Sequence, residues 1–170
     1  MLIYLIFLFI YGIIYQYIYV FAKGLDKVKE NFLMTMITHQ LIEGEKEVIE
    51  MTSLASFEGN ADDYSITYCD EDGDLKGCKT TLHVEKGSMV TIRREGDYSS
   101  HIIVEKNARH VSHHVTPYGT FAMGVSALDV DSKMTEKGGK LSFRYSTDMD
   151  MRPIGEIQFD ITVKERNLNF

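Results

Sequence analysis

From Phe32 onward, apolar and polar residues alternate with a period of two, and this alternation constrains the fold more than any other feature of the sequence. Successive side chains of a strand point to opposite faces, so the alternation predicts strands with one inward and one outward face. Turn residues such as Gly, Asn and Asp separate the runs. We therefore expect ten strands, over residues 32–41, 46–57, 63–69, 78–84, 88–94, 98–104, 108–115, 119–131, 140–149 and 154–164.

The run 119–131 changes parity along its length. Apolar residues occupy odd positions from Phe121 to Ala127 and even positions at Leu128 and Val130. A β-bulge shifts the parity of a strand by one residue and bends it, as happens at the corners of barrels. The pattern therefore predicts a bulge near Ala127.

Ten short strands joined by tight turns predict an all-β fold, a single antiparallel meander β-barrel of about 8–10 strands. Closure into a barrel removes the exposed edges that an open meander would leave. A two-sheet sandwich is the alternative, but it needs long crossing connections that the sequence lacks. A barrel of this size either fills its interior with side chains or admits one small ligand.

The first 22 residues are uncharged and consist mainly of Ile, Tyr, Phe and Leu. About 20 apolar residues suffice to span a bilayer, so an N-terminal hydrophobic helix would serve as a membrane anchor, with Lys23, Lys27 and Lys29 holding the following domain in the cytoplasm. A secretory signal fits less well, because no basic residue precedes the run. The favoured interpretation is a start codon placed too far upstream. We therefore divide the chain into a leader, residues 1–27, and a barrel domain, residues 28–170.

The formal net charge of −7 disfavours nucleic acid as a partner, because binding phosphates needs clustered Lys and Arg. Cys69 and Cys78 are too few for a disulfide framework and fit no zinc or redox spacing. They flank an acidic loop and could face each other across a hairpin, but for a cytosolic chain we expect two reduced thiols. The acidic segment 70–74 begins like a calcium loop, but Leu75 and Thr81 stand where Gly and Glu are required. No catalytic motif is present, so we expect neither an enzyme nor a cofactor.

His110, His113 and His114 are candidate metal ligands because they are close in sequence. In a strand, however, His110 and His114 lie about 13 Å apart, and His113 points to the opposite face. No acidic or thiol ligand completes a set, so we expect no metal. A two-residue turn at Lys106-Asn107 would pair residue 101 with residue 112. That pairing places His113 on the apolar, inward face, either as a core residue with a hydrogen-bond partner or as a ligand contact.

Several short motifs, in their order and spacing, resemble the YwiB-like family of bacterial proteins, a domain of unknown function. The resemblance covers about residues 30–165. It is carried by Thr116-Pro117-Tyr118-Gly119, Lys79-Thr80-Thr81, Ile92-Arg93-Arg94-Glu95-Gly96, Gly138-Gly139-Lys140-Leu141, Tyr145 and Gly155.

The resemblance implies a calycin-like, lipocalin-like barrel in the cytoplasm, without a long hydrophobic leader. The family has no known activity, so it implies no function. Carried onto this chain, the positions of interest are Arg93, Thr116, Tyr118 and Gly119, each of which also has a structural explanation. Arg93 could pair with an acidic neighbour on its strand, the segment 116–119 could shape a turn, and Tyr118 could cap the end of the barrel.

The leading hypothesis is a binding protein that holds a small, partly apolar and anionic molecule in its lumen. Arg93 would be the charge partner, and His113, Thr116 and Tyr118 would be polar contacts. The alternative is a solid barrel that acts as a structural or protein-interaction module. In that case the lumen would be filled by Met34, Met51, Phe121, Phe143 and Phe159. An enzyme of unknown class is the third hypothesis.

Overall fold

The computed structural model describes residues 31–71 and 73–166. The predicted leader, with its conditional helix, lies outside these residues. Within the described part of the chain, no helix combines the length and the apolar character needed to cross a membrane.

Ten strands and one short 3-10 helix account for the described chain. The helix, η1, spans Gly73–Leu75 and lies in the loop between β3 and β4. The strands are β1 (Phe32–Ile42), β2 (Glu45–Gly59), β3 (Asp63–Cys69), β4 (Lys79–Glu85), β5 (Met89–Glu95), β6 (Ser99–Glu105), β7 (Arg109–Thr116), β8 (Gly119–Thr135), β9 (Gly138–Met149) and β10 (Arg152–Glu165).

Each strand pairs antiparallel with the next, and β1 pairs with β10 to close the barrel. The predicted meander barrel is therefore confirmed, and each of the ten expected strands is present. The alternation of apolar and polar residues is the cause, because each strand can bury one face in the common interior while the other meets water.

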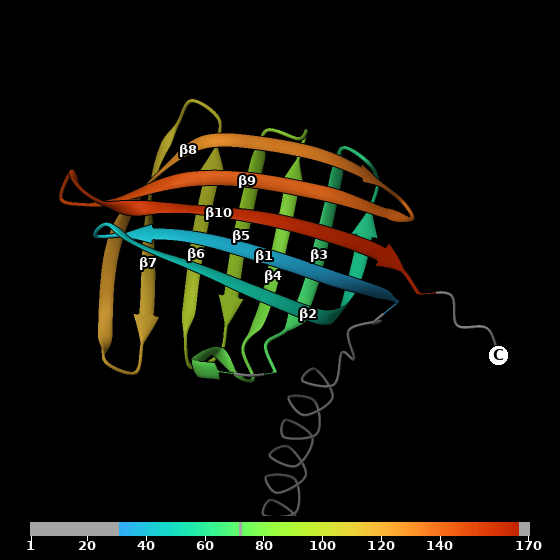
Figure 1. Cartoon of the computed structure of the whole chain (residues 1–170), viewed down its shortest axis with the longest axis horizontal. Coiled ribbons are helices and arrows are strands. Elements are labelled where there is room, and N and C mark those ends of the chain that lie inside the picture. The colour runs from blue at the N-terminus through green and yellow to red at the C-terminus, as the bar shows by residue number, and fades with distance from the viewer. Residues whose placement is uncertain (1–30, 72, 167–170) are drawn as a thin grey trace, which may run out of the picture.

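The barrel is built as two layers that cross at a steep angle (Figure 1). Strands β3 to β7 form one layer, and β1, β9 and β10 lie in the other (Figure 1). Two long strands turn the corners between them. β2 pairs with β1 up to Ala55 and with β3 from Ala55 onward, and β8 changes register between Ala127 and Asp129. The bulge predicted near Ala127 is thus confirmed.

The apolar core fills one end of the barrel, the end opposite η1. The largest fully buried side chains include Tyr64 of β3 and Phe143 of β9, and the same core cluster holds valines and leucines of β4, β5, β6, β8, β9 and β10. Burial of this apolar surface is the main force that stabilises the barrel. The other end, where the β3–β4 loop lies, is not filled in this way.

Candidate functional site

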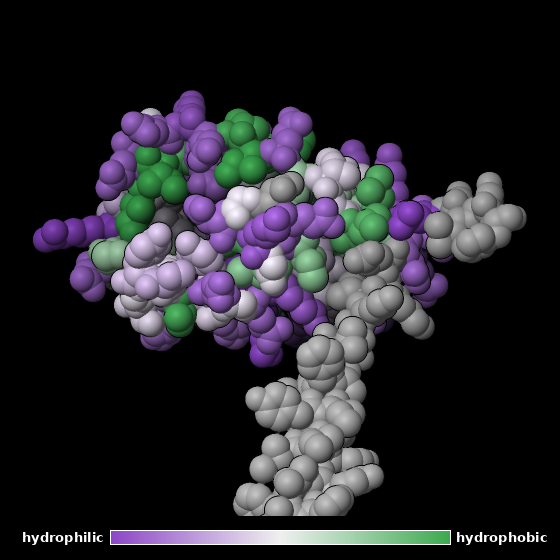
Figure 2. Space-filling model, turned by 90° about the horizontal axis from the view of Figure 1, so that it is seen from below, coloured by the Kyte–Doolittle hydropathy of each residue, from purple (hydrophilic) through white to green (hydrophobic). Residues whose placement is uncertain are grey.

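A cavity of about 690 Å³ occupies the end of the barrel near the β3–β4 loop. Figure 2 views the molecule from this end, where hydrophilic side chains predominate and apolar ones form separate groups. One wall of the cavity comes from β1, β2 and β10, and its apolar side chains include Met36, Met51, Ile157 and Phe159. The opposite wall comes from β3, β5, β6, β7 and the β3–β4 loop, and it carries Arg94 and other polar groups.

A continuous row of polar side chains runs along the second wall at one level. Tyr68, Arg94 and His114 of this row line the cavity, while Thr80 and Ser100 are buried between them. Strand register places Tyr68 opposite Thr80, Thr80 opposite Arg94, Arg94 opposite Ser100, and Ser100 opposite His114. We call these five residues the polar belt. Directly opposite partners on one face of a sheet have their Cβ atoms about 5 Å apart, so the belt is a connected strip. The next inward residues on β3 to β6 are the apolar Ile66, Leu82, Ile92 and Ile102.

Hydrogen bonds connect the first part of the belt to Asp70, which is buried at the start of the β3–β4 loop. The Thr80 hydroxyl donates to Asp70 Oδ2 at 3.2 Å and accepts from Arg94 Nε at 3.3 Å. Burial raises the pKa of the Asp70 carboxyl, while the Arg94 charge and the Thr80 hydrogen bond oppose that shift. Burial and the nearby Asp70 charge raise the pKa of Tyr68 to about 12. The phenol of Tyr68 is therefore neutral across the physiological range.

His114 ends the belt at the boundary with β8. Its ring stacks on Phe121, with centroids 5.1 Å apart and planes inclined by 7°. The Ser112 hydroxyl donates to the His101 carbonyl at 2.9 Å, so it accepts from His114 Nε2 at 3.0 Å, and the second ring nitrogen keeps a lone pair in the neutral ring. Burial, Arg94 and His113 lower the pKa of His114. The imidazole is therefore held in its neutral form at neutral pH.

Ser100 lies between Arg94 and His114 in the belt and has 8% of its surface exposed. Its hydroxyl oxygen is buried and has no hydrogen-bond partner. Within the described residues, it is the one buried side-chain N or O atom without a partner. A buried hydroxyl without a partner costs free energy that most proteins avoid, so the position requires an explanation.

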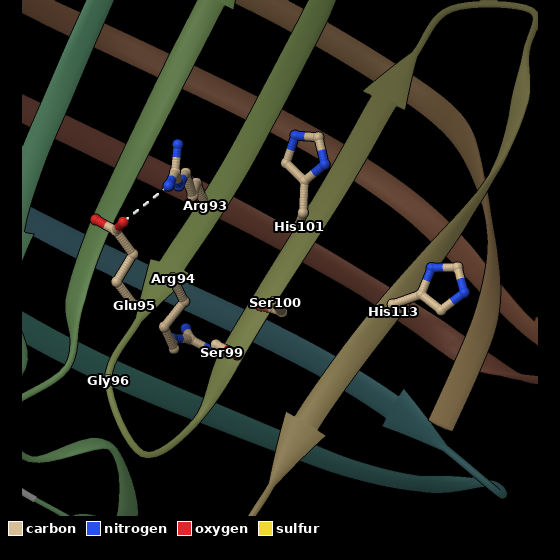
Figure 3. A pocket seen from close by; sticks show the side chains of 8 residues that line it. All are labelled: Arg93, Arg94, Glu95, Gly96, Ser99, Ser100, His101 and His113. Carbon is tan, nitrogen blue, oxygen red and sulfur yellow. Dashed lines mark hydrogen bonds and ion pairs between the residues drawn. The ribbon is translucent and has the colours of Figure 1, made fainter. Parts of the chain in front are cut away.

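The structure corrects the expected positions of Arg93 and His113. Both side chains lie on the outer face of the barrel, where Arg93 is opposite His101 and His101 is opposite His113 (Figure 3). The Arg93 guanidinium binds Glu95 at 2.9 Å, which is the strand-neighbour pairing considered from the sequence. The neighbouring residues Arg94 and His114 occupy the luminal positions instead.

Thr116, Tyr118 and Gly119 form the turn between β7 and β8. The Thr116 hydroxyl donates to the Gly119 carbonyl at 3.0 Å and accepts from the Tyr118 amide at 3.2 Å. Gly119 has a φ of +140°, which favours glycine. The Tyr118 side chain is 93% exposed, so it does not cap the barrel, and none of these residues lines the cavity. Their role in the structure is to shape the turn.

The luminal arginine could have been identified from the sequence. Val90 and Ile92 are buried, and Arg94 continues their parity, so alternation along β5 alone assigns Arg94 to the interior. Ser100 could have been assigned in the same way from Ile102 and Val104 on β6. No such signal marks His114, because the inward residues of β7 are polar and the outward Val111 and Val115 are apolar.

Metal chemistry has no support in the described part of the chain, where no three His, Cys, Asp or Glu side chains are grouped to hold an ion. The carboxylate of Asp70, the first residue of the acidic segment, accepts a hydrogen bond from Thr80. Both cysteines are free, with Cys69 exposed and Cys78 buried. The cavity thus combines the apolar side chains of β1, β2 and β10 with the cationic Arg94 and hydrogen-bonding groups on the opposite wall.

Comparison with known proteins agrees with this fold. Among solved structures, the crystal structure of the YwiB protein from Bacillus subtilis matches with a TM-score of 0.70 and 18% sequence identity, covering 80% of this chain and 92% of that chain. At this identity the match shows the fold alone. No curated protein matches the chain. The model of the family described as "Domain of unknown function (DUF1934)" matches residues 34–161. The chain therefore belongs to the DUF1934 family, in agreement with its resemblance to YwiB-like proteins.

Proposed function

We propose that this protein binds one small, largely apolar molecule in the lumen of its barrel. The observation that carries the proposal is the cavity of about 690 Å³ between the two layers. Ligand sites commonly have volumes of about 300–1,000 Å³, with mostly apolar walls and a few polar groups that fix orientation. The apolar side chains of β1, β2 and β10, with the polar belt opposite them, match that description.

The positions of the large interior side chains favour this proposal over a solid barrel. Of the five residues expected to fill a solid lumen, only Met34 and Phe143 are fully buried. Met51 and Phe159 border the cavity, and Phe121 is 40% exposed beside His114. Side chains therefore fill one end of the barrel and leave space at the other.

The fluorescence of N-phenyl-1-naphthylamine, a neutral aromatic probe that brightens in apolar surroundings, tests the proposal. The full-length chain is titrated with the probe, alongside a Met51→Trp variant that fills the cavity from the wall of β2. We expect the variant to weaken probe binding by at least about tenfold, because the larger ring takes the volume that the probe needs.

Val48→Trp is the matched control. Val48 lies on the same strand as Met51, but it is 58% exposed on the outer face, so the same ring added there leaves the lumen unchanged. Thermal melting of both variants shows whether each retains the fold. Equal probe binding by the wild type, Met51→Trp and Val48→Trp would rule out the lumen as the binding site.

A further inference from the structure

We infer that the luminal molecule carries one anionic head group, a carboxylate on an apolar body, and that Arg94 and Ser100 form the subsite for this group. This inference rests on the proposed function. It adds the chemical class of the ligand and the position of its charged end.

Arg94 supplies the positive charge. Arg93, Arg109 and Arg144 each form an ion pair with a carboxylate. Arg94 forms no ion pair within the described residues. Its Nε donates to Thr80, and its side chain also hydrogen-bonds the Tyr68 phenol. A guanidinium has five N–H donors, so these two neutral partners leave donor capacity for a carboxylate. A guanidinium in a partly dry cavity recognises a carboxylate more strongly than one in water does.

Ser100 supplies an independent reason to expect a ligand beside Arg94. Its buried hydroxyl has no hydrogen-bond partner among the residues that the structure describes, and the residue lies directly opposite Arg94 on one side and His114 on the other. The Arg94 guanidinium and the Ser100 hydroxyl are both hydrogen-bond donors, and a carboxylate is an acceptor. Arg94 and His114, the two residues on either side of Ser100, line the cavity, so a carboxylate bound by Arg94 lies next to the Ser100 hydroxyl and can accept its hydrogen bond.

The remainder of the cavity defines the rest of the molecule. The wall that faces the belt is lined by Met36, Met51, Ile157 and Phe159, which offer apolar contacts. A ligand whose head group is at the belt therefore places an apolar body against β1, β2 and β10.

The charges around the cavity favour one negative charge over several. Asp70 is linked to Arg94 through Thr80 and offsets part of its charge. Glu50, Glu71 and Asp74 also border the cavity and are exposed. These carboxylates repel a polyanion such as a nucleotide, while a single carboxylate beside Arg94 retains a net attraction.

Competition between decanoate and decanol tests the inference, because the two molecules share a chain length and differ in the head group. Each displaces N-phenyl-1-naphthylamine from the full-length protein at pH 7.5, and the signal that remains in Met51→Trp is subtracted. We expect decanoate to bind more tightly than decanol. In Arg94→Gln, decanoate binding should weaken by about tenfold or more while decanol binding changes less than about twofold.

Two further variants define the subsite. Arg94→Lys keeps the charge and should retain part of the decanoate affinity, and Ser100→Ala should weaken decanoate by a few-fold without affecting decanol. Arg93→Gln is the matched control, because Arg93 is the next residue on β5 but points outward. It should leave both affinities unchanged. Probe binding in each variant also reports that the lumen has folded.

The outcomes separate this inference from the proposed function. If the probe binds in the lumen but decanoate and decanol compete equally, or if Arg94→Gln acts no differently from Arg93→Gln, the head-group subsite is wrong and luminal binding stands. If Met51→Trp leaves probe binding unchanged, luminal binding and the subsite are both wrong.

Discussion

Arg109 on β7 binds both carboxylate oxygens of Asp148 on β9, with its Nε and Nη2 atoms 2.9 and 2.7 Å from the two oxygens. The two residues lie two strands apart, and the pair crosses β8 at Gly124, which is directly opposite Asp148. A Cβ atom at Gly124 would overlap the Arg109 guanidinium and the Asp148 carboxylate. The pair lowers the pKa of Asp148 and raises that of Arg109. The absence of a side chain at Gly124 therefore leaves the space in which the Arg109–Asp148 ion pair links β7 to β9 across β8.

We predict that Gly124→Ala destabilises the barrel by about 1–3 kcal/mol, the usual cost of forcing an extra methyl group into an occupied space. Urea denaturation followed by circular dichroism measures this change. In an Arg109→Ala background the same substitution should cost clearly less, because the guanidinium that it displaces is gone. An equal cost in both backgrounds would show that the methyl group disturbs something other than the ion pair.

Most of the fold could be predicted from alternation and turn residues, as the behaviour of two strands illustrates. Along β9, Leu141, Phe143 and Tyr145 are buried, as their shared parity indicates. Along β8, the change of parity after Ala127 correctly identified the bulge. These features are local, and each follows from the pleat of a strand with one buried face.

The candidate site was predicted less well, because it depended on the register between β6 and β7. The turn contains residues 106 to 108, one more than Lys106-Asn107, so His101 pairs with His113 and not with residue 112. A register error of one residue moves every side chain to the opposite face. The polarity of β7 could not correct the error, since a lumen that holds a polar belt reverses the usual rule that apolar residues face inward.

The two cysteines should differ strongly in reactivity. Cys69 is exposed, while Cys78 has 1% of its surface exposed and lies beneath the Gly96 backbone. We predict that dithionitrobenzoate modifies one thiol of the native protein rapidly and the second only after denaturation. Absorbance of the released thiolate measures the stoichiometry, and Cys69→Ser should remove the rapid phase. Two rapid equivalents from the wild type would contradict the burial of Cys78.

Tyr68 should make the barrel sensitive to alkali. Its pKa rises to about 12 in the folded protein from an ordinary value of 10.0. Between these two values Tyr68 is ionised in the unfolded chain and largely neutral in the native state. Its contribution to the free energy of unfolding is therefore fully present below pH 10 and is lost as the pH rises toward 12. We predict a smaller fall in the urea midpoint between pH 9 and pH 11 for Tyr68→Phe than for the wild type.

Tyr118→Phe is the control for this experiment, because it removes a hydroxyl from a side chain that is 93% exposed. The urea midpoint of this variant should fall with pH as that of the wild type does. If the midpoint of Tyr68→Phe falls equally, the loss of stability in alkali comes from other groups, such as Tyr145, because burial also raises the pKa of Tyr145.

His114 should make the barrel sensitive to acid. Burial lowers its pKa from 6.5, and the charge of Arg94 and the neighbouring His113 add to that effect. As the pH falls below 6.5, the unfolded chain takes up a proton at this position more readily than the native state does, so the folded state loses stability. We predict that His114→Gln, which cannot titrate, reduces the loss of stability between pH 7.5 and pH 5.5. Urea denaturation of both proteins at these two values measures the difference, and identical losses would show that the imidazole is protonated as readily in the barrel as in the unfolded chain.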